Sequence, residues 1–186
     1  MEHLYTALFC EENIWHLAND LIQQGVQPDE LSVIFISNKL QQTVIFNQRS
    51  AEPDTPAIWD YHVILLKKSP TECLIFDFDS LSNLPTAAEQ YLKVSFPDEI
   101  ELPEEYQVYF RLIDAPTYLR LFSSDRSHMQ GILEPGKFPK YDAILKPESS
   151  ERLTLKQLIN FNQPINNKIS LMNQMEFMRF ISIQSR

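Results

Sequence analysis

Two apolar runs joined by a short polar turn constrain the fold most strongly. Residues 58–66 (IWDYHVILL) are rich in aromatic and β-branched side chains, and residues 72–79 (ECLIFDFD) follow after a turn that contains Pro70. Both runs have the composition of β-strands. The sequence therefore predicts a β-hairpin in which residues 58–66 form a central strand.

The pairing of this hairpin decides which side chains meet. If residues 68–71 form the turn, His62 lies opposite Asp77, with Cβ atoms about 4.5–5.5 Å apart, within reach of an imidazole–carboxylate hydrogen bond. A shift of two residues pairs His62 with Asp79 instead. A shift of one residue is disfavoured because it would place the histidine beside Phe78, on the wrong face. The pattern leaves both aspartates as candidates.

A helix is predicted from Glu11 to about Gln24, ended by Gly25. Its apolar positions recur with helical spacing at Ile14, Leu17, Ala18, Leu21 and Ile22. Cys10 precedes the helix on this apolar side. Unpaired N–H groups and the helix dipole favour a thiolate there, although Glu11 and Glu12 oppose it. The alternative is an inert, buried free cysteine.

The remaining chain predicts further strands and helices. Residues 31–37 and 42–47 read as a hairpin, and residues 108–113 as a strand. Helices are expected at 85–94, from a cap at Asp114 through about residue 122, and at 155–161 after a cap at Thr154. Residues 168–183 are amphipathic and fit either a strand or a helix.

Composition narrows the choice of partners. The 186 residues fit a single domain, 1–186. With 25 acidic and 16 basic residues the net charge is -9, which disfavours nucleic acid and anionic membranes as partners and favours a cationic ligand such as a peptide amine. Two cysteines form no disulfide framework, and neither a membrane span nor a secretion signal is evident. We expect a protein of a reducing compartment.

Metal binding is not predicted. The four histidines, His3, His16, His62 and His128, are scattered, with no CxxC or HExxH spacing. We therefore expect neither a metal nor a cofactor.

Three of these positions supply the groups of a thiol-dependent hydrolase. A thiol nucleophile needs a base, and the base needs a third group that fixes its tautomer. Cys10, His62 and Asp77 are of those types. The alternatives are a hydrogen-bonded core histidine at His62, and a cap or a lysine partner at Asp77.

Four sequence blocks resemble the protein N-terminal glutamine amidohydrolase family. They are residues 10–15 (CEENIW), 35–38 (FISN), 58–63 (IWDYHV) and 124–129 (SDRSHM). Their order and separations are similar to the family's across residues 5–129, and the match weakens beyond. The resemblance implies an α/β (α+β) fold with an antiparallel central sheet sandwiched by helices, as in papain-like and transglutaminase-like cysteine hydrolases.

The resemblance also implies an activity. The family converts N-terminal glutamine of proteins and peptides into glutamate and ammonia, a step that feeds degradation dependent on the N-terminal residue. It implies Cys10 as the nucleophile, His62 as the general base and Asp77 as the orienting acid, with no cofactor. A monomer in the cytoplasm, with the nucleus as a second location, is expected.

Substrate binding needs further groups. The Cys10 backbone amide is the expected first oxyanion donor. Candidates for a carboxylate that receives the substrate amine are Glu12, Asp60, Asp79 and Asp125, although Glu11 and Glu12 could be plain first-turn charges. Residues 125–128 could line the cleft, or an Asp–Arg pair could fix this loop.

Three neighbouring side chains are expected to contribute to packing and not to catalysis or binding. We predict that Trp59 and Tyr61 point away from His62 into the core, and that Cys73 fills space.

Two other classes of function remain open. A transglutaminase-like deamidase of internal glutamine, or a cysteine peptidase, would keep the three groups and change the substrate. A binding module for N-terminal residues would have lost the chemistry.

Overall fold

A six-stranded antiparallel sheet forms the centre of the computed structural model, which describes residues 5–149, 151–166 and 169–182. Its strand order is β10-β7-β1-β4-β5-β6. These strands are β1 (Leu31–Ser37), β4 (His62–Lys68), β5 (Cys73–Phe76), β6 (Thr86–Ala87), β7 (Tyr109–Asp114) and β10 (Ser170–Asn173). Two small sheets flank it, formed by β2 (Thr43–Ile45) with β3 (Ala57–Trp59) and by β8 (Phe122–Ser123) with β9 (Leu153–Thr154).

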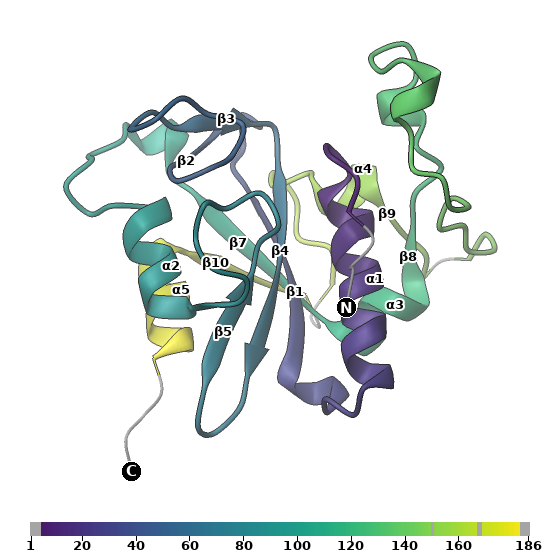
Figure 1. Cartoon of the computed structure of the whole chain (residues 1–186), viewed down its shortest axis with the longest axis horizontal. Coiled ribbons are helices and arrows are strands. Elements are labelled where there is room, and N and C mark those ends of the chain that lie inside the picture. The colour runs from purple at the N-terminus through teal and green to yellow at the C-terminus, as the bar shows by residue number, and fades with distance from the viewer. Residues whose placement is uncertain (1–4, 150, 167–168, 183–186) are drawn as a thin grey trace.

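Helices cover both faces of the sheet (Figure 1). On one face lie α1 (Cys10–Gln23), α3 (Ala115–Leu121) and the short α4 (Leu155–Leu158). On the other lie α2 (Ala88–Ser95) and α5 (Gln174–Ile181). The predicted α+β class, with helices on either side of an antiparallel sheet, is confirmed.

Strand β1 is buried on both faces and divides the core in two. Its side chains alternate, as in any strand, so Val33 and Phe35 join the cluster under α1 and α3, whereas Ile34 and Ile36 join the cluster under α2 and α5. All four are fully buried. This explains why residues 31–37 are apolar almost without interruption.

The predicted hairpin of residues 31–37 with residues 42–47 is wrong. Strand β1 pairs with β4 and β7, while β2 pairs with β3. The buried Asn38 redirects the chain after β1: its Oδ1 accepts the backbone N–H groups of Leu40 and Gln42, and its Nδ2 donates to the Gln42 carbonyl. These bonds hold a turn that carries β2 away from its expected partner.

The second hairpin forms, but its register is shifted by two residues from the one first predicted. Lys68 pairs with Cys73, and the turn comprises residues 69–72, closed by a 2.9 Å bond from the Ser69 N–H to the Glu72 carbonyl. This register directs His62 toward Asp79. The pairing ends at Phe76, however, and Asp77 reaches His62 across the diagonal, so the predicted contact exists although the register does not.

Other predicted elements differ mainly at their ends. The strand predicted at residues 58–66 is split into β3 and β4 by Asp60 and Tyr61. The helix expected at 85–94 begins at Ala88, after β6, and the amphipathic segment 168–183 contains both β10 and α5, although Lys168 and Ile183 lie outside the described residues. The caps at Asp114 and Thr154 are confirmed.

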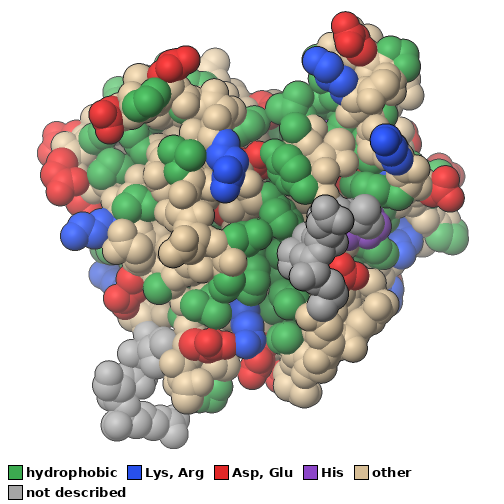
Figure 2. All heavy atoms as spheres, in the orientation of Figure 1, with side chains coloured by type: hydrophobic (Ala, Val, Ile, Leu, Met, Phe, Trp, Pro, Cys, Tyr) green, Lys and Arg blue, Asp and Glu red, His purple; other side chains and the backbone are tan. Residues whose placement is uncertain are grey.

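None of the helices in the described parts of the chain is long and apolar enough to cross a membrane. On the face drawn in Figure 2, lysine and arginine side chains stand singly among acidic ones.

We predict that Phe177→Ala detaches α5 from the sheet. Phe177 is fully buried and stacks on Phe110 of β7, with ring centroids 4.3 Å apart. Its removal should cost about 3–5 kcal/mol of unfolding free energy in urea denaturation. Met175→Ala on the same helix is the control, because Met175 is 61% exposed and should cost under about 0.5 kcal/mol. Equal losses in both variants would contradict this account of the core.

Candidate active site

Cys10 is the first residue of α1, and the segment before it is fixed by hydrogen bonds. The Thr6 N–H donates to Asn13 Oδ1, and Asn13 Nδ2 donates to the Thr6 carbonyl, both at 2.9 Å. Leu8 takes the left-handed conformation (φ 69°), which turns the chain into the helix. Phe9 is completely buried and anchors this turn.

The thiol of Cys10 lies against the start of β4. Its Sγ is 3.7 Å from Glu11 Oε2, and the backbone amide of Val63 also hydrogen-bonds to it. Because Val63 directly follows His62, this contact brings Cys10 to the strand position beside the histidine. Helix and hairpin therefore meet at the residues that the sequence singled out.

The electrostatic setting of the thiol differs from expectation. Burial raises the pKa of Cys10 well above its ordinary value, and the charges of Glu11 and Asp79 raise it further; the Val63 amide only partly opposes them. The predicted stabilisation of a thiolate by the helix N-terminus is outweighed here. The neutral thiol is therefore favoured.

His62 and Asp77 form a buried pair. His62 Nε2 is 2.8 Å from Asp77 Oδ1, and both side chains are about 1% exposed. Burial lowers the pKa of His62, but the charge and hydrogen bond of Asp77 outweigh it, and the net shift is upward. For Asp77, burial raises the pKa and His62 lowers it, with a net downward shift. His62 Nδ1 is buried and accepts or donates no hydrogen bond among the described residues.

Asp77 is held by three further donors. Gln48 Nε2 and the Tyr91 hydroxyl donate to its Oδ2 at 3.1 and 2.9 Å, and the backbone N–H of Asp79 donates to Oδ1 at 2.9 Å. Gln48 and Tyr91 were not found from the sequence. No spacing connects them to the hairpin, since both reach Asp77 only through tertiary packing.

The prediction that Trp59 points away from His62 is wrong. Its ring stacks on His62 with centroids 5.5 Å apart and an interplanar angle of 18°, instead of pointing away. The chain bends between β3 and β4, so the alternation expected of one continuous strand does not hold. Tyr61 is buried as expected, and Cys73 packs partly buried against the cluster beneath α2 and α5.

Glu12 is not simply an exposed charge in the first turn of α1. It is fully buried and forms a bidentate ion pair with Arg126, with Nε–Oε1 3.0 Å and Nη2–Oε2 2.7 Å. Arg126 also donates to the Pro139 carbonyl and lies over the Tyr141 ring. The loop is therefore fixed by a Glu–Arg pair between helix and loop, and not by the Asp125–Arg126 pair considered from the sequence.

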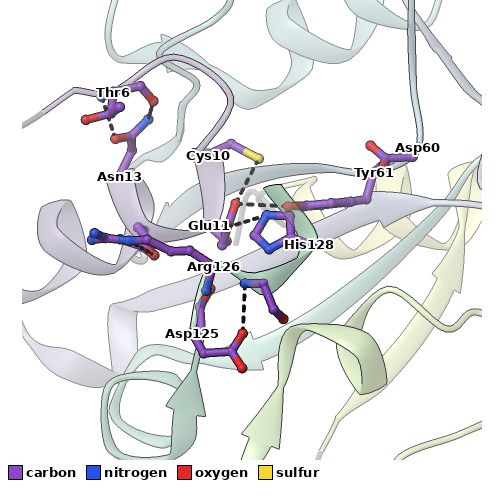
Figure 3. Close-up of polar contacts among 12 residues, drawn as sticks. Thr6, Cys10, Glu11, Asn13, Asp60, Tyr61, Asp125, Arg126 and His128 are labelled. Atoms are coloured by element: carbon purple, nitrogen blue, oxygen red, sulfur yellow. Dashed lines mark hydrogen bonds and ion pairs between the residues drawn. The ribbon is translucent and has the colours of Figure 1, made fainter. Parts of the chain in front are cut away.

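Glu11 is buried beside the thiol (Figure 3). Its Oε2 accepts the Tyr61 hydroxyl at 3.1 Å, while its Oε1 lies 3.6 Å from His128 Nε2 and has no hydrogen bond. Burial, followed by the neighbouring charge of Glu12, raises the pKa of Glu11 to about 7. His128, in the 125–128 loop, therefore faces the region around Cys10 through its contact with Glu11.

The carboxylates considered for substrate binding have different surroundings. Asp60 is exposed and accepts its neighbour's N–H, from Tyr61, at 2.9 Å. Asp125 is also exposed and accepts the Ser127 N–H, pointing away from Cys10 in Figure 3. Asp79 is 9% exposed and accepts the Tyr5 hydroxyl at 2.7 Å.

Three of these residues are of types that bind metal ions. Ligand atoms of His62, Asp77 and Asp79 lie within 4.8 Å of one another. Both oxygens of Asp77 already accept hydrogen bonds, and His62 Nε2 is engaged by one of them. Hydrogen bonding therefore accounts for this cluster. His3 lies outside the described residues.

A groove of about 640 Å³ lies elsewhere, between the loop after α2 and the start of α5. It is lined in part by Phe96, Ile100 and Met175. None of the candidate residues lines it, so it takes no part in the site around Cys10.

A thiol at a helix start, beside an imidazole–carboxylate pair on a sheet, is the arrangement typical of cysteine-dependent acyl-transfer enzymes. The family model described as N-terminal glutamine amidase matches residues 5–181, so the chain belongs to this family.

Relatives named protein N-terminal glutamine amidohydrolase align with the chain. The zebrafish (Danio rerio) protein is 37% identical over 158 residues, which cover 81% of this chain and 76% of the relative. The human (Homo sapiens) protein is 36% identical over 129 residues, 68% of this chain and 63% of the relative, and the Drosophila ananassae protein is 37% identical over 131 residues with the same two shares. The chain thus matches between about three fifths and three quarters of these relatives' lengths.

Glu11→Gln should change the pH dependence of stability. Because the pKa of Glu11 rises from 4.5 in the unfolded chain to about 7 in the folded one, the folded state loses stability as pH rises through this interval. The amide keeps an acceptor for Tyr61 without the charge. We expect Glu11→Gln to be more stable than the wild type at pH 8, by on the order of 3 kcal/mol, and equal to it near pH 4.

Denaturant unfolding at both pH values measures this difference. Glu151→Gln is the control, because Glu151 is exposed in an ion pair with Arg120 and should change stability by under about 1 kcal/mol at either pH. A Glu11→Gln difference that does not vary with pH would rule out the buried charge as its cause.

Proposed function

We propose that the protein hydrolyses the side-chain amide of an N-terminal glutamine, giving N-terminal glutamate and ammonia. The family membership supports the substrate class. The single observation that carries the chemistry is the thiol of Cys10 beside the buried His62–Asp77 pair, whose hydrogen bond is 2.8 Å long.

In the first half-reaction Cys10 is the nucleophile. His62 takes the thiol proton as Sγ attacks the amide carbon of the substrate side chain, and a C–S bond forms. The carbonyl becomes an oxyanion. His62 then gives that proton to the amide nitrogen, the C–N bond breaks, and ammonia leaves a γ-glutamyl thioester.

In the second half-reaction water replaces ammonia. His62 removes a proton from a water molecule that attacks the thioester, the C–S bond breaks, and the proton returns to the sulfur. Asp77 keeps the proton of Nε2 directed at itself, which leaves the unpaired Nδ1 free to exchange protons with the reacting groups. The raised pKa of His62 supports its service as both acid and base.

The oxyanion needs N–H donors. Cys10 is the first residue of α1, and the first N–H groups of a helix have no partner within it. We assign its backbone amide as one donor, which the positive end of the helix dipole reinforces.

We further propose that residues 1–186 form a single catalytic domain that acts as a monomer in the cytoplasm and, as a second location, the nucleus. The free thiols of Cys10 and Cys73 are in keeping with a reducing compartment. Proteins and peptides with a free N-terminal glutamine are its partners, and its product feeds degradation dependent on the N-terminal residue.

The substrate class is tested with four peptides: Gln-X-X, acetyl-Gln-X-X, Asn-X-X and X-Gln-X. We expect ammonia, and a mass increase of about 1 Da, only from Gln-X-X. Turnover of internal glutamine would indicate a transglutaminase-like deamidase, and cleavage of the peptide chain a cysteine peptidase. Binding of Gln-X-X without ammonia release would indicate a binding module.

The roles of the side chains are tested by substitution. Cys10→Ala and His62→Ala should abolish turnover, and Asp77→Asn should lower kcat by about 10⁴-fold because it changes the tautomer of the histidine. Cys73→Ala is the matched cysteine control and should keep activity, since Cys73 lies on the far face of the sheet. Circular dichroism checks that each variant is folded. Activity in Cys10→Ala would make the mechanism wrong.

A further inference from the structure

Selection of an N-terminal residue requires a group that recognises the free α-ammonium of the substrate. This question rests on the proposed function, because only an N-terminal glutamine carries that charge next to the reacting amide. The charges of Glu11, Asp79 and Asp60 are those felt by the Cys10 thiol, and all three are acidic. A cationic substrate group is the natural counterpart of such a site.

Two of the acidic residues considered from the sequence are already engaged elsewhere. Glu12 is neutralised by the bidentate contact with Arg126, and a second cation there would have to displace a buried guanidinium. Asp125 accepts the Ser127 N–H on an exposed loop, and its charge is not among those that shift the thiol pKa.

Glu11 and Asp60 are also poorly suited. Glu11 is completely buried under the helix start, where Oε2 already accepts the Tyr61 hydroxyl and Oε1 faces His128. Asp60 is exposed, so water screens its charge and weakens any contact with an amine.

Asp79 has the required surroundings. It is 9% exposed, and one of its carboxylate oxygens lies within 4.8 Å of a ring nitrogen of His62. Its Oδ1 accepts the Tyr5 hydroxyl, whereas Oδ2 accepts no hydrogen bond in the described part of the chain. The nearby Arg49 is exposed and makes no ion pair with Asp79 among the described residues.

We propose that Asp79 binds the α-ammonium of the substrate through Oδ2, with Tyr5 as the positioning residue that holds its other oxygen. In glutamine only Cα, Cβ and Cγ separate the amine nitrogen from the carbon that Cys10 attacks. A carboxylate that is close to both the thiol and His62 is therefore within reach of the amine when the amide is at the sulfur.

This contact would couple recognition to reactivity. The negative charge of Asp79 raises the pKa of the Cys10 thiol. A bound ammonium cancels that charge and makes the thiol easier to deprotonate. An acetylated or internal glutamine brings no charge and leaves the carboxylate desolvated without a partner, so such a substrate is rejected.

The test is a double-mutant cycle between enzyme and substrate. The substrates are Gln-X-X and its des-amino analogue, in which hydrogen replaces the α-amine, and the enzymes are wild type and Asp79→Asn. We expect wild type to prefer Gln-X-X by about 100-fold in kcat/KM, the loss typical of removing one partner of a largely buried charge pair. In Asp79→Asn we expect the preference to fall below about 5-fold. Turnover of the analogue should rise, because the neutral amide no longer raises the pKa of the Cys10 thiol.

Asp60→Asn is the matched control and should keep the wild-type preference. Tyr5→Phe should reduce the preference partially, since it removes only the hydrogen bond that orients Asp79. An equal loss on both substrates in Asp79→Asn would mean that the residue is structural and would overturn the inference, as would a preference that disappears in Asp60→Asn instead. Failure of the wild type to release ammonia from Gln-X-X would overturn the proposed function itself.

Discussion

The candidate site depends on one buried carboxylate. Asp77 accepts four hydrogen bonds, from His62, Gln48, Tyr91 and the backbone of Asp79, and its side chain is only about 1% exposed. A buried carboxylate that lacked such partners would be protonated or would open the fold. The same hydrogen bonds fix the histidine ring. The contacts that stabilise this part of the fold are therefore also the contacts that orient the imidazole.

Three acidic side chains lie near the His62–Asp77 pair, and they differ in the partners that neutralise their charge. Glu12 is neutralised by Arg126, and that pair ties the helix start to the loop that follows β8. Glu11 stays beside the thiol with a pKa of about 7. One carboxylate oxygen of Asp79 lies within 4.8 Å of a His62 ring nitrogen, and its Oδ2 accepts no hydrogen bond among the described residues. The fold thus neutralises Glu12 with an arginine, whereas Glu11 and Asp79 have no lysine or arginine partner among the described residues.

Much of the layout could be predicted from the sequence. Strand β1 occupies residues 31–37 as expected, because a short apolar run rich in β-branched residues is typical of a strand buried on both faces. Its partner was wrongly predicted, since the bonds of Asn38 that redirect the chain leave no periodic signal. The predicted hairpin register was also wrong by two residues. A turn of residues 68–71 and a turn of residues 69–72 have the same length, and the sequence does not show which of them closes the hairpin.

The kinds of group and their places in the chain follow from the sequence: a thiol at a helix start, an imidazole on one strand and a carboxylate at the end of the next. These follow from local periodicity and composition, which depend on nearby residues alone. Three contacts arise only from tertiary packing: Gln48 and Tyr91 hold Asp77, Trp59 stacks on His62, and Arg126 neutralises Glu12. Those contacts join residues from 3 to 114 positions apart, and burial, which sets their strength, exists only once the layers have packed.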